Sequence, residues 1–466
     1  MRERPLEVHA LVGSVIRLKN VELPPSTLGA LRRTLSFPNP AFTARLRMGR
    51  WTGDTPEEIC LVERDRAGVV TLPRGAVELL QASLDEVGAR LVFKDLRVRH
   101  EPLHYPLLFE LRDYQEEAVE ALVSHTQGVV VLPCGAGKSV IGAAAISRCQ
   151  QPSLVIVHTH DLLEQWRGTL RGALGVEPGV IAEGRVALAE VVVATVQTLA
   201  TLPRAELEEV GARFGTVVVD ECHHVPASTF RDVLSALPAL YRFGLTATPE
   251  RSDGLTPLLN LTIGEPVYEV AHRRLVERGY LVIPKVMPIY TQVTAQAKTH
   301  HALIEALTSH RARNQRIVDL ATECSFNRRA TLILSGRVEH CERLAALLCE
   351  GDVAAAALTG HTPKASRGEL LEAFREGELA VLCATSLADE GLDISRLERL
   401  ILATPTRAEG RTIQRLGRLM RPHPGKSTPI LYDLVDDHPM AYSQFKARRA
   451  AYRKVLDVSQ LGVSDD

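Results

Sequence analysis

Uninterrupted apolar runs of four or five residues recur along the chain from about residue 111 onward, and stretches with helical spacing separate them. Apolar runs without alternation are buried on both faces, which is typical of parallel strands that lie between layers of helices. The pattern predicts strands at residues 128–132, 154–157, 191–194, 216–219, 331–334, 380–383 and 399–402. Strands and helices that alternate in this way predict two α/β domains in tandem, each built on a parallel sheet.

The first hundred residues follow a different pattern. Proline and glycine turns separate short segments there, among them a β-rich run at residues 58–62, and such spacing predicts a small mixed α/β module. A polar, helix-like segment at residues 291–327 opens the last domain or links it to the preceding one. We therefore expect an accessory module at residues 1–105 and two α/β domains at residues 106–285 and 286–466.

Composition narrows the class of protein. The 466 residues are 45% hydrophobic and 24% charged, and no apolar run approaches the ~20 residues of a membrane-spanning helix. The N-terminal segment has no apolar stretch of signal-peptide length, so we expect a cytoplasmic protein without a membrane partner, nucleoid-associated in a bacterium or nuclear in a eukaryote. The eight cysteines are scattered without a C-x-x-C pair, which favours reduced thiols.

The formal net charge of −1 argues neither for nor against a polyanionic partner, but basic residues are concentrated near the N-terminus. The segment between Glu22 and Asp54 has no acidic residue. Its basic and aromatic residues are Arg32, Arg33, Arg45, Arg47, Arg50, Phe37, Phe42 and Trp51. Arginines beside aromatic side chains suit phosphate contact combined with base stacking. Solvated arginines around a small core would give the same pattern, so both interpretations stay open.

A glycine-rich turn follows the first predicted strand. Strand, glycine-rich turn and helix start are the context of a phosphate-binding loop, because backbone N–H groups and the helix dipole converge there on an anion. The loop consists of Pro133, Cys134, Gly135, Ala136, Gly137, Lys138 and Ser139. Lys138 would neutralise the β- and γ-phosphates of ATP, and the Ser139 hydroxyl would bind Mg²⁺. Leu132 stands where the general pattern has its first glycine, and an ordinary glycine-rich turn is the alternative.

Two acidic residues, Asp220 and Glu221, follow the predicted strand at residues 216–219. Ligands of open α/β sheets bind at the carboxyl ends of the strands. We therefore expect Asp220 and Glu221 to join Ser139 around Mg²⁺, with Glu221 also acting as the general base that activates water. An isolated Asp-Glu pair is typically a solvated turn, but the apolar strand before it and the phosphate loop favour a catalytic site.

The loop and the acidic pair resemble motifs of superfamily 2 helicases. Residues 132–139 are similar to motif I, and residues 220–223 are similar to the DEAH form of motif II, with Cys222 in the alanine position. The resemblance to motif II also implies that Asp220 contributes to nucleotide binding. The resemblance implies a fold of two tandem RecA-like domains preceded by the accessory module, and it implies ATP and Mg²⁺ as the cofactors.

Two further segments of the first domain resemble motifs of the same superfamily. Residues 111–115, which precede the phosphate loop, are similar to the adenine-reading element of these helicases. This similarity implies that Arg112 and Gln115 contact the nucleotide. Residues 245–249 are similar to motif III, which implies that Thr246 and Thr248 couple the nucleotide site to the nucleic acid.

The last domain carries two more of these motifs. Residues 384–393 resemble motif V, which implies nucleotide contacts by Gly391 and Asp393. The motif VI pattern Q-R-x-G-R-x-x-R begins at Gln414, whose side chain would contact the γ-phosphate or the attacking water. The resemblance makes Arg418 and Arg421 arginine fingers, and we expect these two residues, three apart on a predicted helix, to share one face.

Contact with a nucleic-acid strand is implied for residues at several other strand ends. Short hydroxyl, glycine and arginine residues there suit binding to backbone phosphates, which is independent of base sequence. The resemblance points to His158, Thr195, Gln197, Arg337, Thr359, Gly360 and Thr385. Each of these is otherwise an ordinary loop residue, and only its place in the motif order favours nucleic-acid contact.

Within the superfamily the chain resembles the XPB-type repair helicases and their phage and bacterial relatives over about residues 108–456. Shared features include a helix with Glu164-Gln165-Trp166 and a basic helix at residues 445–449, whereas Arg251-Ser252-Asp253 departs from the Arg-Glu-Asp element of that group. The resemblance implies an ATP-driven motor with 3′-to-5′ polarity on single-stranded, forked or branched DNA, acting in repair or recombination.

Two other functions stay open at the level of sequence. The track could be RNA, as in many DEAH-type relatives, or the chain could be a motor subunit that unwinds little without a nuclease or repair partner protein. The accessory module corresponds to the damage-recognition module of the XPB group only in position and size. DNA binding by the accessory module is therefore a separate hypothesis, which rests on its arginines and aromatic residues.

Overall fold

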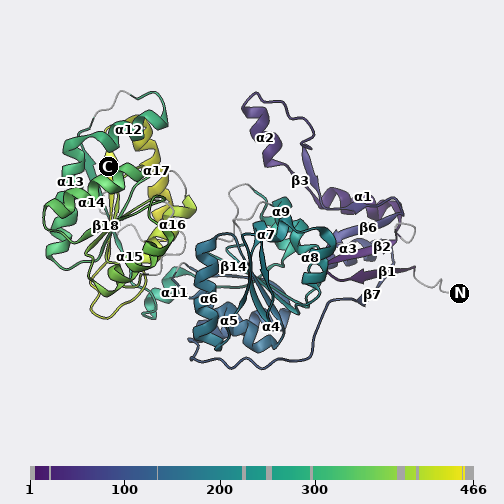
Figure 1. Cartoon of the computed structure of the whole chain (residues 1–466). Coiled ribbons are helices and arrows are strands. Elements are labelled where there is room, and N and C mark those ends of the chain that lie inside the picture. Colours follow the sequence, from purple (N-terminus) through teal and green to yellow (C-terminus); the bar gives the residue numbers. More distant parts are fainter. Residues whose placement is uncertain are drawn as a thin grey trace. The chain divides into compact units, whose positions relative to one another are not determined.

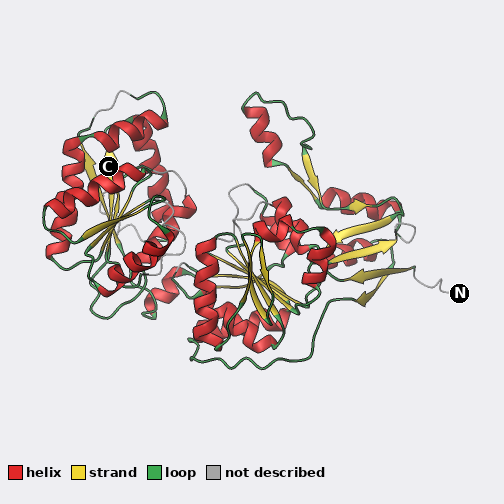
Figure 2. Ribbon diagram, viewed as in Figure 1, coloured by secondary structure: helices red, strands yellow, loops and turns green. Residues whose placement is uncertain are grey.

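A computed structural model of the chain shows a series of sheets flanked by helices (Figures 1 and 2). It describes residues 6–19, 23–133, 135–222, 227–247, 254–293, 297–385, 394–405, 409–453, 455 and 456, without the side chains of residues 227, 228, 230, 364, 365, 409–411, 413 and 414. These residues form two compact units, one of residues 1–132 with 137–269 and one of residues 133–136 with 270–466. No helix in the described part combines the length and apolar character needed to cross a membrane.

An eight-stranded sheet forms the centre of the first unit. Its order is β11-β10-β12-β9-β13-β14-β8-β15, and all neighbouring pairs except β10 and β11 are parallel. The strands are β8 (Gln127–Val131), β9 (Ser153–Val157), β10 (Gly179–Ala182), β11 (Arg185–Ala187), β12 (Val191–Thr195), β13 (Thr216–Asp220), β14 (Tyr241–Thr246) and β15 (Pro266–Glu269). Because parallel strands end at one edge, the segments that follow β8, β13 and β14 meet there.

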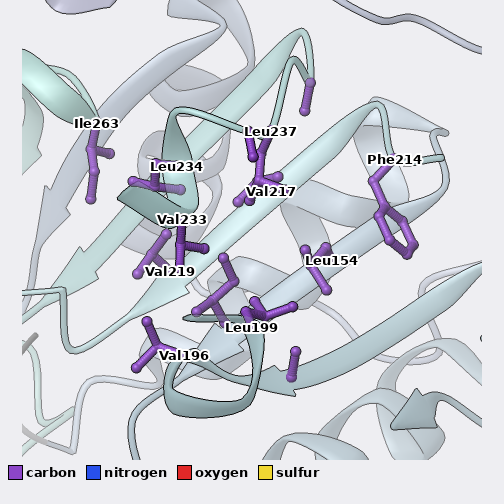
Figure 3. Packing of buried hydrophobic residues seen from close by; sticks show 14 of the residues in the cluster. Leu154, Val196, Leu199, Phe214, Val217, Val219, Val233, Leu234, Leu237 and Ile263 are labelled. Carbon is purple, nitrogen blue, oxygen red and sulfur yellow. The ribbon is translucent and has the colours of Figure 1, made fainter. Parts of the chain in front are cut away.

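Helices cover both faces of this sheet (Figure 2). They are α4 (Asp113–His125), α5 (Lys138–Cys149), α6 (His160–Leu174), α7 (Val196–Thr201), α8 (Arg204–Gly211), α9 (Ala227–Leu234) and α10 (Thr256–Thr262). On one face, apolar side chains of the central strands pack against α7, α8 and α9. Figure 3 shows this cluster around Leu154, Val217 and Val219. Helices α4, α5 and α6 cover the other face (Figure 1).

The accessory module is a five-stranded mixed sheet of order β5-β6-β2-β1-β7, with a separate two-stranded ribbon, β3–β4. Its elements are β1 (Glu7–Val12), β2 (Val15–Lys19), α1 (Pro25–Thr34), β3 (Ser36–Pro38), α2 (Pro40–Arg47), β4 (Glu58–Cys60), β5 (Glu63–Arg64), β6 (Val69–Pro73), η2 (Arg74–Ala76), α3 (Val77–Asp85) and β7 (Arg90–Asp95). The core of the module also includes Leu255, Leu258 and Leu261 at α10. The core of the module therefore continues into α10 of the parallel-sheet domain.

Arg74 of η2 joins the module to the first parallel sheet. Its side chain is buried, with 2% of the residue exposed, and Nε donates to Gln127 Oε1 at 2.7 Å. Its two terminal nitrogens donate to the carbonyl oxygens of Ala239 and Leu240. At the neighbouring Gly75, an added Cβ would lie 2.6 Å from the carbonyl oxygen of Leu261, so the two backbones approach too closely for any side chain.

Arg242 of β14 makes a second link to the module. Its Nη2 donates to the carbonyl oxygen of Ser14, in the turn between β1 and β2, at 3.2 Å. The same guanidinium donates to the carbonyl oxygens of Thr262, Leu234 and Leu237. Burial lowers the pKa of Arg242 to about 10, which leaves it charged at neutral pH. A buried cation of this kind is stable only while its hydrogen-bond acceptors stay in place.

The second unit is built on a six-stranded parallel sheet of order β16-β21-β20-β17-β19-β18. Its elements are α11 (His272–Glu277), β16 (Lys285–Thr291), α12 (His300–Ser309), α13 (Arg311–Phe326), β17 (Thr331–Leu334), α14 (Val338–Glu350), β18 (Ala355–Leu358), α15 (Lys364–Glu376), β19 (Val381–Ala384), β20 (Arg399–Leu402), α16 (Glu409–Leu419), β21 (Ile430–Asp436) and α17 (Pro439–Arg453). Two apolar clusters, one on each side, hold the helices to this sheet.

Buried ion pairs fix β21 within the second sheet. Asp433 accepts hydrogen bonds from Arg448 of α17 at 2.7 Å and 2.9 Å and from the Tyr452 hydroxyl at 2.8 Å. Asp436 accepts from Arg313 of α13 at 2.6 Å and 3.0 Å. Both carboxylates are buried, so the loss of either arginine would leave an uncompensated charge in the core.

The predicted fold class is confirmed, because two parallel-sheet domains follow a small mixed module. All seven predicted strands coincide with observed strands, namely β8, β9, β12, β13, β17, β19 and β20. The polar segment at 291–327 contains α12 and α13, as its helical pattern indicates. The domain limits expected at residues 105 and 285 remain predictions.

We expect Arg74→Lys to destabilise the first unit by about 2–4 kcal/mol, because a lysine ammonium cannot replace the planar fork that reaches all three acceptors. The measurement is thermal denaturation of the full chain, in which the first unit should melt several degrees lower. Arg64→Lys, at an exposed site on β5, is the matched control and should leave the midpoint nearly unchanged. Equal midpoints for the two variants would show that the buried fork does not hold the module.

Candidate nucleotide site and nucleic-acid interface

The predicted phosphate loop follows β8 and leads into α5, which begins at Lys138. Gly135 and Gly137 have φ values of +87° and +78°, which residues with a Cβ rarely adopt. The helix starts directly after the second glycine, so its first backbone N–H groups and the side chains of Lys138 and Ser139 lie at the carboxyl edge of the sheet. This is the strand, turn and helix arrangement that the sequence predicts. Cys134 lies outside the described residues.

The phosphate loop is closed by a backbone hydrogen bond and lies beside the predicted adenine-reading residue Gln115. Within the loop, the Ala136 N–H donates to the carbonyl oxygen of Pro133 at 3.1 Å and closes a tight turn. Beside the start of α5, a Cβ added to Gly137 would lie 2.7 Å from Gln115 Nε2. Gln115 Oε1 accepts from the Arg112 N–H at 3.0 Å, which fixes the start of α4. The structure therefore places the predicted adenine-reading glutamine against the second loop glycine.

The acidic pair lies at the end of β13. Asp220 is buried, with 6% of the residue exposed, and Oδ2 accepts a hydrogen bond from Trp166 Nε1 at 2.8 Å. Its other oxygen accepts from the Glu221 N–H at 2.9 Å. Glu221 has a φ of +45°, and a residue with a Cβ that is held in this region is strained, as is common at functional sites. Cys222 is buried, and His223 lies outside the described residues, so the DEAH assignment remains a prediction.

Charges of opposite sign meet between the loop and the acidic pair. Lys138 Nζ lies 3.0 Å from Glu221 Oε1, and both side chains are largely buried. Burial and the neighbouring Glu221 charge raise the pKa of Asp220 to about 6, while the Lys138 ammonium acts in the opposite direction. Two carboxylates, a hydroxyl and an ammonium at a helix start fit the oxygen ligands and the charge of a magnesium–triphosphate complex.

Thr246 lies between the two parts of this site. It ends β14, which is paired with β8 on one side and β13 on the other. The Leu132 N–H donates to the carbonyl oxygen of Thr246 at 2.9 Å, and the Cys222 N–H donates to that of Leu245 at 3.2 Å. A shift of β14 would therefore be felt by both the phosphate loop and the acidic pair. Thr248, the other predicted coupling residue, lies outside the described residues.

Three predicted nucleic-acid residues of the first unit lie together. Thr195 ends β12 in register with the last residue of β9, which His158 follows. Gln197 Nε2 donates to the carbonyl oxygen of His158 at 2.9 Å. Burial lowers the pKa of His158, while the carboxylate of Glu221 acts in the opposite direction. The charge of Glu221 in the acidic pair therefore influences the protonation of His158.

The predicted nucleic-acid residues of the second unit follow three adjacent parallel strands. Arg337 comes after β17, Thr385 after β19, and Thr359 with Gly360 after β18. The Thr385 N–H donates to the carbonyl oxygen of Leu358 at 3.4 Å, which keeps two of these segments side by side. The carboxyl edge of the second sheet therefore brings all four residues into one row.

A directional chain of hydrogen bonds fixes the segment that contains Arg337. Asn314 Nδ2 donates to the carbonyl oxygen of Thr308 at 2.8 Å, so Oδ1 faces His340 Nε2 at 3.0 Å and requires the proton on that nitrogen. His340 Nδ1 then accepts from the Ser335 hydroxyl at 2.8 Å, and Ser335 Oγ accepts from the Arg337 N–H at 3.3 Å. Burial together with nearby arginine charges lowers the pKa of His340 to about 3.

The motif VI residues lie at the end of α16. Arg418 is on this helix, but the helix ends at Leu419, so the expected shared helical face of Arg418 and Arg421 is wrong. Pro422 follows Arg421 directly, and the residue before a proline is disfavoured in a helix. The side chain of Gln414 is not described.

Gly391 and Asp393, the predicted motif V contacts, lie outside the described residues, as do Arg251, Ser252 and Asp253. Two residues with clear structural roles at the site, Trp166 and His340, were not predicted as site residues. The tryptophan within Glu164-Gln165-Trp166 was the only sequence signal for the first, and no local pattern indicates the second.

The comparisons with known proteins agree with this arrangement. Residues 108–251 match a family model described as type III restriction enzyme, res subunit, and residues 312–423 match the helicase conserved C-terminal domain. The chain is 30% identical over 388 residues to the Sulfurisphaera tokodaii protein named "DNA 3'-5' translocase XPB2", covering 74% of this chain and 87% of that protein. It is 28% identical over 376 residues to "DNA 3'-5' helicase XPB" of Kineococcus radiotolerans, covering 76% and 66%.

A solved structure supports the fold. The Pyrococcus furiosus Hef helicase domain matches with a TM-score of 0.50 and 16% identity, over 73% of this chain and 98% of that one. The two parallel-sheet domains are therefore RecA-like, as in superfamily 2 helicases. The chain belongs to the XPB-type family within that superfamily.

Replacing the Trp166 donor tests its contact with Asp220. In Trp166→Phe the carboxylate loses a hydrogen bond that favours its charged form, so its pKa should rise further. We expect the Mg²⁺ concentration for half-maximal ATP hydrolysis to rise about tenfold, which corresponds to one hydrogen bond to a charged group. Phe93→Leu, at an exposed aromatic residue on β7 away from the nucleotide site, is the control. An unchanged Mg²⁺ requirement in Trp166→Phe would rule out this positioning role.

His340 makes the stability of the second unit depend on pH. Its folded-state pKa of about 3 lies below the ordinary value of 6.5, so the unfolded chain binds the proton first as the pH falls. The free energy of unfolding should therefore decrease below pH 6.5, by up to about 1.4 kcal/mol per pH unit. Thermal denaturation at pH 7, 6 and 5 measures this loss. His340→Gln, which cannot titrate, should show a flatter profile, and parallel profiles would contradict the assignment.

Proposed function

We propose that the protein is an ATP-dependent DNA translocase with 3′-to-5′ polarity, which separates or remodels DNA strands in repair or recombination. One observation carries this proposal: Lys138, Asp220 and Glu221 meet at the carboxyl edge of the first RecA-like sheet, with the ammonium 3.0 Å from the Glu221 carboxylate. The names of both XPB-type relatives, a translocase and a helicase with 3′-to-5′ polarity on DNA, support the choice of activity and track.

Each residue of the pocket has a role that follows from its chemistry. Lys138 and the N–H groups at the start of α5 would hold the phosphates, and Glu221 would take the proton of the attacking water. Ser139 and Asp220 would hold the metal ion of the magnesium–ATP complex. A bound Mg²⁺ would supply positive charge against the triphosphate oxygens. Gln115 and Arg112, beside the start of α5, would contact the adenine.

Hydrolysis would be completed from the second RecA-like domain. Gln414, Arg418 and Arg421 would contact the γ-phosphate, since arginines stabilise the charge of a transferred phosphoryl group. Gly391 and Asp393 would add further nucleotide contacts.

The proposed DNA strand would follow the carboxyl edges of both sheets. His158, Thr195 and Gln197 would bind phosphates in the first domain, and Arg337 with Thr385 in the second, independent of base sequence. The hydrogen bonds from β14 to the segments on both sides of it support a coupling role for Thr246.

A second candidate function is a motor subunit that works with a nuclease or repair partner. It is favoured by the match of residues 108–251 to a restriction-enzyme subunit model. Strand displacement by the purified chain distinguishes the two functions. A complete helicase would displace a strand from a forked DNA by itself, whereas a motor subunit would hydrolyse ATP with little displacement.

Two substitutions test the catalytic pocket. Lys138→Ala should weaken ATP binding, and Glu221→Gln should preserve binding while removing the base, so both should lower DNA-stimulated ATP hydrolysis at least about 100-fold. Lys94→Ala, at an exposed site on β7, is the control and should hydrolyse ATP at the wild-type rate. Substantial turnover by Glu221→Gln would require another base.

The choice of track is tested on the wild-type chain. ATP hydrolysis is measured with single-stranded DNA and RNA of equal length and matching sequence. We expect stimulation by DNA to exceed stimulation by RNA, and the reverse order would replace the DNA motor by an RNA motor.

A further inference from the structure

An arm made of residues 36–60 projects from the accessory module. It consists of the β3–β4 ribbon, the helix α2 and the loop that joins α2 to β4. Figure 1 shows α2 standing away from the five-stranded sheet, joined to it through the ribbon. No residue of α2 is buried. A helix in a folded domain normally buries one face, whereas the faces of α2 are open to contact with another molecule.

The base of the arm is held firmly. Asn39 is buried and caps α2, with Oδ1 accepting from the Ala41 N–H at 3.0 Å. Its Nδ2 donates to the carbonyl oxygen of Pro56 at 2.8 Å, and its backbone N–H donates to that of Glu57 at 2.9 Å. Both ends of the arm are thus tied to one residue. The exposed helix and loop are presented in a defined orientation from the module.

The exposed surface of the arm is basic. Arg45, Arg47 and Arg50 are all exposed, and none of them forms an ion pair with another described residue. The preceding helix α1 ends with two more exposed arginines, Arg32 and Arg33. The sequence has no acidic residue between Glu22 and Asp54, a segment that contains all five of these arginines. Charge of one sign concentrated in this way favours a polyanionic partner.

Trp51 adds an exposed aromatic surface next to these arginines. It is 84% exposed, and part of its ring lies against Gly53. A Cβ added to Gly53, which has a φ of +51°, would lie 2.7 Å from the indole ring. Arg45 Nη1 also donates to the carbonyl oxygen of Thr52 at 3.4 Å, which joins the helix to this loop. One face of the indole is therefore supported and the other is open to solvent.

We propose that the arm binds an unpaired DNA strand, with a base stacked on Trp51 and the backbone phosphates on Arg45, Arg47 and Arg50. The proposal rests on the proposed function insofar as DNA is the track. An unpaired base is favoured over duplex because a stacking platform needs a base that has already left its neighbours, whereas duplex bases are stacked on each other. Arginine charges without a supported aromatic ring would bind duplex phosphates equally well.

Deletion of the module is a poor test of this proposal. The core of the module continues into Leu255, Leu258 and Leu261, and Arg242 donates to Ser14. Removal of residues 1–105 would expose that core and take away one of the acceptors of the buried Arg242 cation. Substitutions in the arm avoid this damage because its outer residues are exposed.

The chain offers a direct optical signal for this contact. It has two tryptophans, and Trp166 is completely buried, so quenching of exposed indole emission reports on Trp51. We expect single-stranded oligodeoxythymidylate to quench this emission in the full chain without nucleotide. Trp51→Phe should remove the quenching and keep the Trp166 emission, which also shows that the variant is folded.

Control ligands separate stacking from charge. Inorganic polyphosphate, which has charge but no bases, and blunt duplex DNA should quench much less than the single strand. The proposal is overturned if the single strand leaves Trp51 emission unchanged, if polyphosphate or duplex quenches as strongly, or if oligouridylate quenches and oligodeoxythymidylate does not.

Affinity measurements test the two parts of the surface. Trp51→Ala should weaken single-stranded DNA binding about 5- to 150-fold, and Trp51→Phe should retain most of the affinity. Changing Arg45, Arg47 and Arg50 to Gln should reduce the slope of log K against log salt by about 2, as expected for the loss of three phosphate contacts with a single strand.

Matched controls come from the same module. Phe93→Ala and the triple change of Arg64, Arg66 and Arg90 to Gln remove exposed aromatic and basic residues outside the arm, and both should bind like the wild type. Equal losses from arm and control variants would overturn the proposal. Wild-type protein without DNA-stimulated ATP hydrolysis would instead refute the proposed function, and the quenching result would still decide the role of the arm.

Discussion

The position of β14 is the constraint on which the first unit depends. The strand lies between β8, which leads into the phosphate loop, and β13, which ends in the acidic pair. Its last residues are hydrogen-bonded to the segments after both neighbours. Arg242 on the same strand donates to Ser14 of the accessory module and to three carbonyl oxygens of the parallel-sheet domain. One strand therefore connects the module, the phosphate loop and the acidic pair, and β14 cannot shift without breaking bonds to all of them.

The strands that could be predicted from sequence are uninterrupted apolar runs, with a polar or charged residue at one end at most. Runs such as 216–219 have no alternative to burial on both faces. The strands β14 and β21 were missed because each carries charged residues that are nevertheless buried, Arg242 in the first and Asp433 with Asp436 in the second. Their partners lie far away in sequence or on the backbone, as when Arg313 pairs with Asp436 across 123 residues. No local pattern can show that such a charge is compensated.

The candidate site was predictable to a similar degree. Lys138, Asp220 and Glu221 stand in short motifs whose chemistry is local, and the structure brings them together. The contact between Trp166 and Asp220 spans 54 residues and depends on how α6 packs over α5, where an added Cβ on Gly142 would lie 2.5 Å from the indole ring. The helix α16 ends before Arg421 because Pro422 follows that residue. This local signal was present in the sequence, but the prediction followed the motif VI pattern instead.

The ion pair between Lys138 and Glu221 has a consequence for the proposed reaction. In a buried pocket an uncompensated charge is costly, and the Lys138 ammonium already acts against the raised pKa of Asp220. A triphosphate that arrived without a cation would draw Lys138 toward its own oxygens and leave two adjacent carboxylates facing more negative charge. A divalent cation bound to the phosphates would offset that charge and favour the ionised form of Asp220. The pocket is therefore suited to accept nucleotide and metal as one complex, and the release of Glu221 from Lys138 would then free the predicted base only when the substrate is present.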